Sequence, residues 1–254
     1  MLFNSYHFLF IFLPIVLLGF YLIVKTENRG LIVYWIIGSS LFFYGWWNPI
    51  YLVVLILSII INYLLGYYLS NNQNKPTLVF GIMVNLLTLG YFKYFNFFID
   101  SYNLLSGSSI IFSEVVLPLA ISFFTFQQIA YLVDAYRGLT KEYNFSYYCL
   151  FVTFFPQLIA GPIVHHKQIL PQFLNNFSLK LTTSNFATGI TIFIIGLFKK
   201  VVFADTIAGY STPVFDAAEN EVALTIFESW LGALAYTFQI YFDFSGYCDM
   251  AVGC

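Results

Sequence analysis

The chain alternates between long uncharged stretches and short segments that hold the charged residues. Residues 1–24 contain no Lys, Arg, Asp or Glu, and the next such stretch covers residues 30–74. A transmembrane helix needs about 20 apolar residues to cross about 30 Å of hydrocarbon. As a single helix, the second stretch would be roughly 67 Å long at about 1.5 Å per residue, so it must fold back on itself. We expect the turn at Trp46-Trp47-Asn48-Pro49, because proline disfavours helix before it and tryptophan is enriched at the membrane interface.

The same pattern along the rest of the chain predicts an all-α fold, a polytopic transmembrane bundle of about eight membrane segments. We expect the first segment to be retained, because no cationic region precedes it and no small-residue cleavage site follows it. No repeat or linker is visible, so residues 1–254 are expected to form a single membrane domain. The segments are expected near residues 1–24, 31–47, 49–70, 77–98, 115–133, 146–163, 186–203 and 222–242.

Basic residues between these segments predict their orientation. Lys25 and Arg29 follow the first segment, Lys75 follows the third, and Arg137 and Lys141 follow the fifth. The turn between the second and third segments has no Lys or Arg, as is usual for an outer loop. Because positive charge collects in cytoplasmic loops, we expect the basic loops inside and the N-terminus outside.

Composition supports a protein that is solvated by lipid. Hydrophobic residues make up 60% of the 254 residues, aromatic residues 22% and charged residues only 9%, with a formal net charge of −2. A soluble domain carries about 25% charged residues, so a soluble enzyme and a disordered chain are both excluded. Nucleic acid is excluded as a partner because no basic stripe is present. The three cysteines form no disulfide framework or metal motif, and no metal site is expected.

Polar residues inside apolar segments are costly and therefore informative. Thr125 and Gln128 are three residues apart and share one helix face. Two interpretations stay open for Gln128. It forms hydrogen bonds between helices, as is common in membrane bundles, or it lines a path for a polar substrate.

Residues 154–173 cannot form a regular span, because two prolines flank a glycine within them. Irregular backbone at membrane depth requires protein or water to satisfy it, so we expect a re-entrant or broken helix here. Adjacent histidines point in different directions and make a poor chelating pair, which leaves a catalytic base or a polar interfacial role. The residues of this candidate re-entrant segment are Pro156, Gln157, Gly161, Pro162, His165 and His166.

Two further clusters combine charge with apolar sequence. Lys199 and Lys200 either extend from a helix end to the interface or attract the phosphates of an anionic donor. The acidic and hydroxyl groups of the last segment must be paired or face water, and Gly246 there allows close backbone approach. With Gln128, the candidate residues for lining a tunnel or cavity are Gln239, Tyr241, Asp243, Ser245, Tyr247 and Asp249.

At these clusters the sequence resembles the membrane-bound O-acyltransferases, in particular their AlgI-like branch of polysaccharide O-acetyltransferases and more distantly the DltB proteins. The resemblance covers essentially the whole chain. The segments that carry it are LPLAISFFTFQQIAYLVDAYRG (117–138), FFPQLIAGPIVHHKQILPQF (154–173), GLFKKVVFAD (196–205) and YTFQIYFDFSGYCDMAVG (236–253).

The resemblance implies a mechanism of acyl transfer in the bacterial cytoplasmic membrane. A cytoplasmic thioester, acetyl-CoA or an acyl carrier, would donate an acyl group that passes to hydroxyls of an extracytoplasmic polysaccharide, with no bound cofactor. A separate acyltransferase or an acyl carrier protein would be a partner. Members of the family are nearly twice as long, and their catalytic histidine would lie beyond Cys254. We therefore expect an N-terminal part of a larger protein, inactive alone. The alternatives are a transporter or channel for a polar solute, or an inert fragment.

Overall fold

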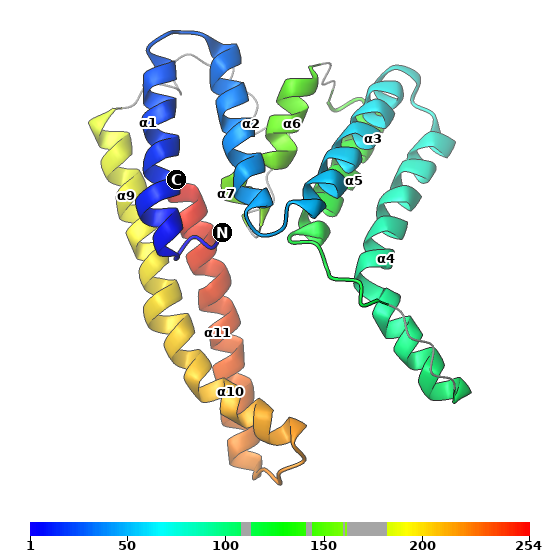
Figure 1. Cartoon of the computed structure of the whole chain (residues 1–254), viewed down its shortest axis with the longest axis vertical. Helices are drawn as coiled ribbons and strands as arrows, with labels where there is room; N and C mark the ends of the chain where they lie inside the picture. The colour runs from blue at the N-terminus through cyan, green and yellow to red at the C-terminus, as the bar shows by residue number, and fades with distance from the viewer. Residues whose placement is uncertain (108–112, 141–143, 160, 162–181) are drawn as a thin grey trace. The chain divides into compact units, whose positions relative to one another are not determined.

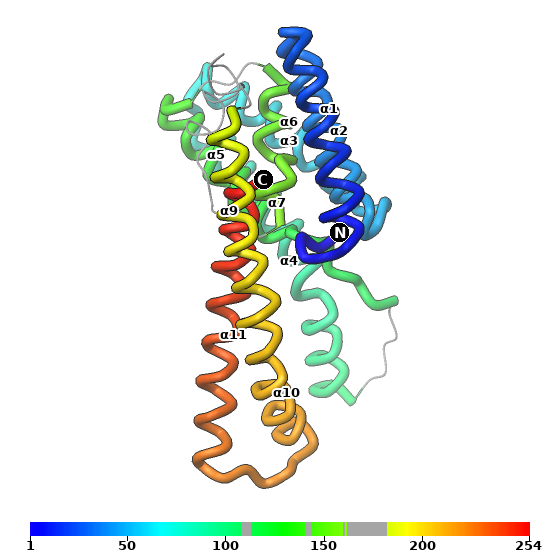
Figure 2. Tube along the Cα trace, turned by 90° about the vertical axis from the view of Figure 1, so that its left-hand side faces the viewer, coloured from blue at the N-terminus to red at the C-terminus, as the bar shows by residue number. Residues whose placement is uncertain are grey.

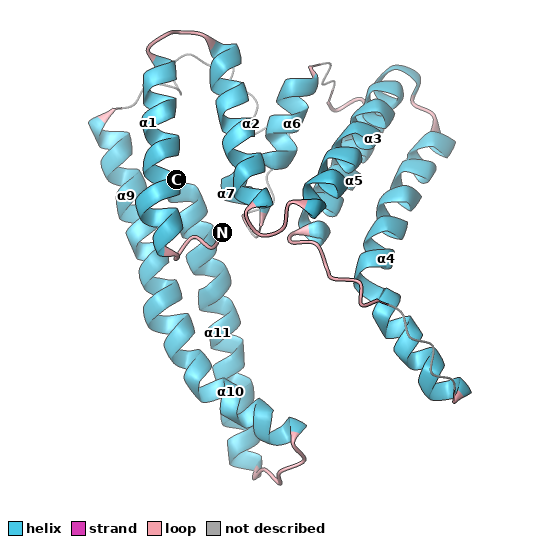
Figure 3. Ribbon diagram, viewed as in Figure 1, coloured by secondary structure: helices cyan, strands magenta, loops and turns pink. Residues whose placement is uncertain are grey.

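The computed structural model describes residues 1–107, 113–140, 144–159, 161 and 182–254, and all regular structure in these ranges is helical (Figures 1 and 3). The prediction of an all-α fold is therefore confirmed for the described residues. The helices are α1 (Leu13–Val24), α2 (Arg29–Gly45), α3 (Ile50–Asn72), α4 (Lys75–Ser106), α5 (Ile121–Tyr136), α6 (Phe145–Thr153), α7 (Phe155–Leu158), α9 (Thr183–Phe198), α10 (Asp205–Glu219) and α11 (Ile226–Gly253), with π-helical segments η1 (Phe8–Phe12) and η2 (Lys199–Ala204).

Three helices in the described part of the chain are long and apolar enough to cross a membrane. They are α3, α4 and the continuous helix Thr183–Glu219, which consists of α9, η2 and α10. A shorter apolar helix covers Phe8–Val24. Helices that are long and apolar enough to span a membrane agree with the sequence pattern, whereas the number of about eight segments stays a prediction.

The turn at the tryptophan pair is where the sequence places it. Helix α2 ends at Gly45, and α3 begins at Ile50 directly after Pro49. The side chain of Asn48 accepts a hydrogen bond of 3.0 Å from the backbone N–H of Ile50 and so satisfies one free donor at the start of α3. Asn28 caps α2 in the same way, through the N–H of Leu31 at 3.3 Å.

The predicted segment 115–133 is wrong at its start. Residues 113–118 form no helix, and side chains from other helices bond to backbone groups among them. The amide of Asn96 donates to the carbonyl oxygen of Val115 at 2.9 Å and accepts from its N–H at 3.1 Å. The hydroxyl of Tyr51 donates to the carbonyl oxygen of Val116 at 2.8 Å. Groups satisfied in this way do not need a helix.

Two other predicted boundaries also differ. Helix α6 has only nine residues, and the chain leaves helical geometry at Phe154, with φ −48° and ψ 105°. The short α7 begins at the next residue, Phe155, and has Pro156 in its first turn. This is the break that the prolines predicted, although the re-entrant path of residues 154–173 lies largely outside the described residues. The last segment continues well beyond residue 242, since α11 ends at Gly253.

The described residues fall into two compact units. The first unit contains residues 1–21, 161 and 182–254, and the second contains residues 22–107, 113–140 and 144–159. The prediction of a single domain is not tested by this division. The core of the second unit is aromatic and aliphatic, with Tyr44, Leu55, Ile59, Tyr131 and Tyr148 each at most 2% exposed.

Helices α9 and α11 of the first unit run side by side, as Figures 1 and 2 both show. Glycines make this approach possible. A Cβ on Gly246 would lie 2.7 Å from the carbonyl oxygen of Gly196, and a Cβ on Gly253 would lie 2.6 Å from that of Gly189. The members of each helix's pair are seven residues apart, so both face the neighbouring helix. Small residues that let backbones touch are typical of packing between membrane helices.

Candidate functional site

The two lysines at the start of η2 lie against the acidic residues of α11. The ammonium of Lys199 contacts a carboxylate oxygen of Asp249 at 2.6 Å and donates to the hydroxyl of Ser245 at 3.1 Å. Both partners come from α11, where Gly246 contacts Gly196 of α9. The sequence treated the lysines and the acidic residues as separate clusters, and the fold of the first unit brings them together.

Lys200 joins two further carboxylates. Its ammonium lies 2.6 Å from a carboxylate oxygen of Asp243 on α11 and 3.0 Å from one of Asp205, the first residue of α10. We call Lys199, Lys200, Asp205, Asp243 and Asp249 the charged cluster. Its lysines are adjacent in sequence, and the wide turn of η2 lets each reach a different set of carboxylates.

The charges of this cluster do not balance. Two ammonium groups face three carboxylates, which leaves one negative charge. The side chain of Asp243 is 54% exposed and that of Asp205 is 48% exposed, whereas that of Lys200 is only 25% exposed. A phosphate would have to compete with these carboxylates for the lysines. Contact between Lys199 or Lys200 and a donor phosphate therefore stays a prediction. The excess negative charge of the cluster makes such contact less favourable.

The remaining predicted residues of α11 have different surroundings. Gln239 accepts a hydrogen bond of 2.6 Å from the hydroxyl of Ser211 on α10. The ring of Tyr247 stacks on Phe3 near the N-terminus, with ring centroids 4.7 Å apart. Tyr241 is exposed within its unit. The six α11 candidates thus lie on several faces of one helix and do not all line one space.

Gln128 lies in the second unit, at one end of a polar network that continues through Ser58 and Asn62 to Asn85. Its side-chain oxygen accepts a hydrogen bond of 3.3 Å from the hydroxyl of Ser58 on α3. Asn62 on α3 and Asn85 on α4 exchange two amide hydrogen bonds of 3.2 and 2.6 Å. Gln128 is fully buried, and its amide nitrogen has no hydrogen-bond partner. These contacts have the form of hydrogen bonding between helices, and the lining role stays a prediction.

The candidate re-entrant segment is described only in part. The side-chain amide of Gln157 on α7 donates to the carbonyl oxygen of Phe151 on α6 at 2.9 Å, and so connects the two helices across the break. Pro156 and Gly161 are buried. Three of the predicted residues lie outside the described residues, namely Pro162, His165 and His166.

Some polar residues of these sites were missed by sequence reasoning. Asn62 and Asn85 are single polar residues in apolar runs, and that signal alone could have found them. Ser211 lies among other polar residues of α10, so the sequence does not single it out. In the described ranges, no three His, Cys, Asp or Glu side chains group so as to hold a metal ion. The charged cluster can hold helices in register and offer exposed carboxylates, and it contains no histidine or cysteine.

Comparison with known proteins identifies the class. The family model of the membrane-bound O-acyltransferase family matches residues 75–254. A peptidoglycan O-acetyltransferase of Helicobacter pylori is 42% identical over the whole chain and 53% of its own length. A probable alginate O-acetylase AlgI of Pseudomonas aeruginosa is 40% identical over the whole chain and 48% of its length.

A more distant relative is a teichoic acid D-alanyltransferase of Bacillus subtilis, which is 28% identical over 53% of this chain and 34% of its own length. The chain spans about half the length of the O-acetyltransferases that it matches. The charged cluster lies inside the segment that the family model matches, as do Gln128 and Asn85, whereas Ser58 and Asn62 on α3 precede it.

Proposed function

The chain belongs to the membrane-bound O-acyltransferase family, and on this premise we propose that it is part of an enzyme that O-acetylates a polysaccharide of the bacterial envelope. One observation carries the proposal: the chain is 40–42% identical, over its whole length, to relatives named for O-acetylation of peptidoglycan and alginate. Teichoic acid is a less favoured acceptor, because the D-alanyltransferase matches only half of the chain.

The proposed reaction exchanges a thioester for an ester. The hydroxyl oxygen of the acceptor forms a bond with the acyl carbon of acetyl-CoA, or of an acyl carrier protein, while a general base takes the hydroxyl proton. The acyl carbon–sulfur bond breaks, and the proton passes from the base to the leaving thiolate, which departs as the thiol. We assign this base to no residue of 1–254. A partner acyltransferase would receive the acetyl group before the polysaccharide if two transfers are used.

We propose that the charged cluster positions α9 and α11 for this reaction. Ionised groups at membrane depth are stable only when they are paired or face water. Each lysine of the cluster has a carboxylate within 2.6 Å, so the contacts of Asp243 and Asp249 fix the register of two long helices. The proposed location is the cytoplasmic membrane with the N-terminus outside, as the basic loops predict.

The experiment measures ester-linked acetate on purified envelope glycan. Cells that lack their own O-acetyltransferase would express the full-length protein, and mild alkali would release acetate from peptidoglycan or exopolysaccharide. The wild type is expected to restore acetylation. Asp249→Asn should lower it on the order of tenfold, the change that about 1.4 kcal/mol produces. Asp216→Asn on α10 is the matched control, because that exposed carboxylate lies outside the charged cluster.

Three results would argue against this account. Equal acetylation in Asp249→Asn and Asp216→Asn cells, at equal amounts in the membrane, would remove the positioning role from the charged cluster. Lower donor affinity as the sole defect of Lys199→Ala would favour contact with donor phosphates. Uptake of an intact solute with no ester on any glycan would indicate a transporter.

A further inference from the structure

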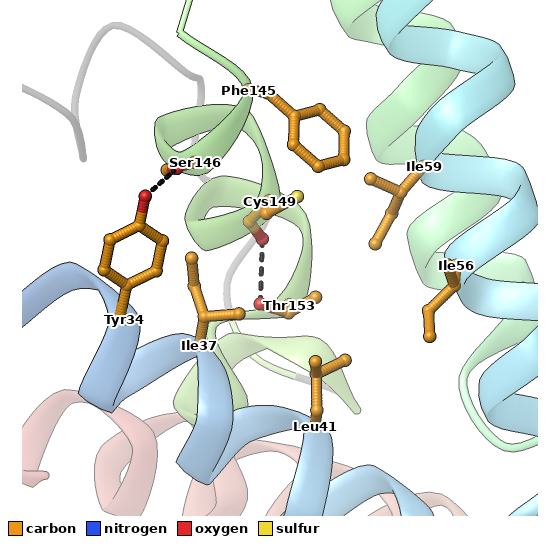
Figure 4. A pocket seen from close by; sticks show the side chains of 9 residues that line it. All are labelled: Tyr34, Ile37, Leu41, Ile56, Ile59, Phe145, Ser146, Cys149 and Thr153. Atoms are coloured by element: carbon orange, nitrogen blue, oxygen red, sulfur yellow. Dashed lines mark hydrogen bonds between the residues drawn. The ribbon is translucent and has the colours of Figure 1, made fainter.

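A cavity of about 260 Å³ lies between α2, α3 and α6 of the second unit (Figure 4). None of its lining residues carries a formal charge at neutral pH. No residue of the charged cluster or of the Gln128 network lines the cavity, and the proposed reaction does not use it. Its lining residues are Tyr34, Ile37, Leu41, Ile56, Ile59, Phe145, Ser146, Cys149 and Thr153.

The polar groups of the cavity are arranged along its length. At one end the hydroxyl of Ser146 donates to the hydroxyl oxygen of Tyr34 at 3.3 Å, and both side chains are near solvent. Further along, the hydroxyl of Thr153 donates to the backbone carbonyl of Cys149 at 2.8 Å, so its proton is already used. Figure 4 shows Leu41 beside Thr153, away from the Tyr34–Ser146 pair. The lining of the cavity is therefore almost wholly apolar, and the exposed hydroxyl pair of Tyr34 and Ser146 marks one end of it.

One wall of the cavity is a helix that is long and apolar enough to lie in a bilayer. This wall is α3, and Ile56 on it is 40% exposed. In a bilayer, such an opening meets lipid tails and not water. An empty apolar space loses dispersion contacts on its lining atoms, whereas an alkyl chain restores them. The polar end of the cavity lies toward the end of α2 that begins with the cation Arg29, which complements a phosphate headgroup.

We infer that this cavity binds one acyl chain of a membrane phospholipid. The headgroup lies toward Tyr34 and Ser146, and the methylene chain runs past Ile56 toward Leu41 and Thr153. The bound chain joins α2, α3 and α6 on a face where their own side chains leave a gap. This lipid is a component of the fold and is neither donor nor acceptor of the proposed acyl transfer.

The test uses photolabelling of the full-length protein in vesicles of phosphatidylethanolamine and phosphatidylglycerol. One probe is a phosphatidylglycerol with a diazirine near the carbonyl end of an acyl chain, and a second carries it near the terminal methyl. After irradiation, labelled peptides are mapped by mass spectrometry. We expect the first probe to label the segment around Ser146 and the second to label positions near Leu41 and Thr153.

Variants of α3 separate this site from general lipid contact. Ile56→Trp places a bulky ring in the opening and should reduce labelling of α2 and α6 at least fivefold. Ile60→Trp is the control, because Ile60 is 39% exposed on the same helix but does not line the cavity. The proposal would be overturned if both probes labelled the same positions, or if Ile56→Trp and Ile60→Trp were labelled equally on α2 and α6. If Ile56→Trp fails to fold, the positions that the two probes label in the wild-type protein decide whether the cavity binds an acyl chain.

Discussion

Among single residues, the lysines of η2 show how a membrane helix retains charge. Lys199 and Lys200 lie inside a helix apolar enough to span a membrane, where an unpaired ammonium is costly. Their carboxylate partners on α11 are 43 to 50 residues away in sequence. Sequence reasoning found both sets of charges, because charges stand out in apolar runs. It could not pair them, because periodicity describes one helix at a time.

A double-mutant cycle tests the pairing of Lys199 with Asp249. Lys199→Met and Asp249→Leu should each lower the free energy of unfolding, since each leaves a charge without its partner. Together they should cost less than the sum, with a coupling energy of about 1 kcal/mol, because both side chains are about 30% exposed and solvent weakens their attraction. Unfolding in detergent micelles provides the measurement. Lys93→Met with Asp249→Leu is the control and should be additive.

Ala120 is a second residue with a local test. It precedes α5 with φ 61° and ψ 13°, in the left-handed region that costs an L-residue free energy. Ala120→Gly should therefore raise the free energy of unfolding by about 1 kcal/mol. Ala135→Gly, in the buried helical face of α5, should lower it. A loss of stability in Ala120→Gly would mean that this backbone conformation carries no strain.

Among the helices, the turn before α3 was predictable and the start of α5 was not. Proline and two tryptophans mark the turn in the sequence itself. The non-helical residues before α5 have hydrogen bonds with Asn96 and Tyr51, which lie on other helices. An apolar run without proline or other turn residues is predicted to be helical. Whether it is helical also depends on the hydrogen bonds that its backbone forms with other helices, which the sequence does not reveal.

Close packing of α9 on α11 gives a test of the helix pair. Gly246→Ala should lower the free energy of unfolding by about 1–3 kcal/mol, because the added methyl meets the backbone of Gly196 and cannot be accommodated by a side-chain rotation. Gly209→Ala on α10 is the matched control. No atom lies within 4 Å of its added Cβ, so this variant should gain stability from helix propensity, by about 1 kcal/mol. Equal effects would mean that the two helices do not touch at Gly246.

For the whole molecule, the family was predictable because its four quoted segments are long and specific. The site was predictable only in part. Gln128 and Gln239 both have polar partners in neighbouring helices, which fits a structural role as well as a functional one. The cavity beside α6 could not be predicted, because three helices together form it and no sequence pattern within one helix indicates it.

The central claim is that the complete protein transfers acetyl groups to an envelope polysaccharide. Membrane vesicles that contain the full-length protein, with the cytoplasmic face outward, would receive acetyl-CoA labelled in its acetyl group. The account predicts alkali-labile label on glycan inside the vesicles, and a strong loss of that label in Asp249→Asn but not in Asp216→Asn. Release of the label only as free acetate, or uptake of an intact solute with no labelled ester, would contradict it.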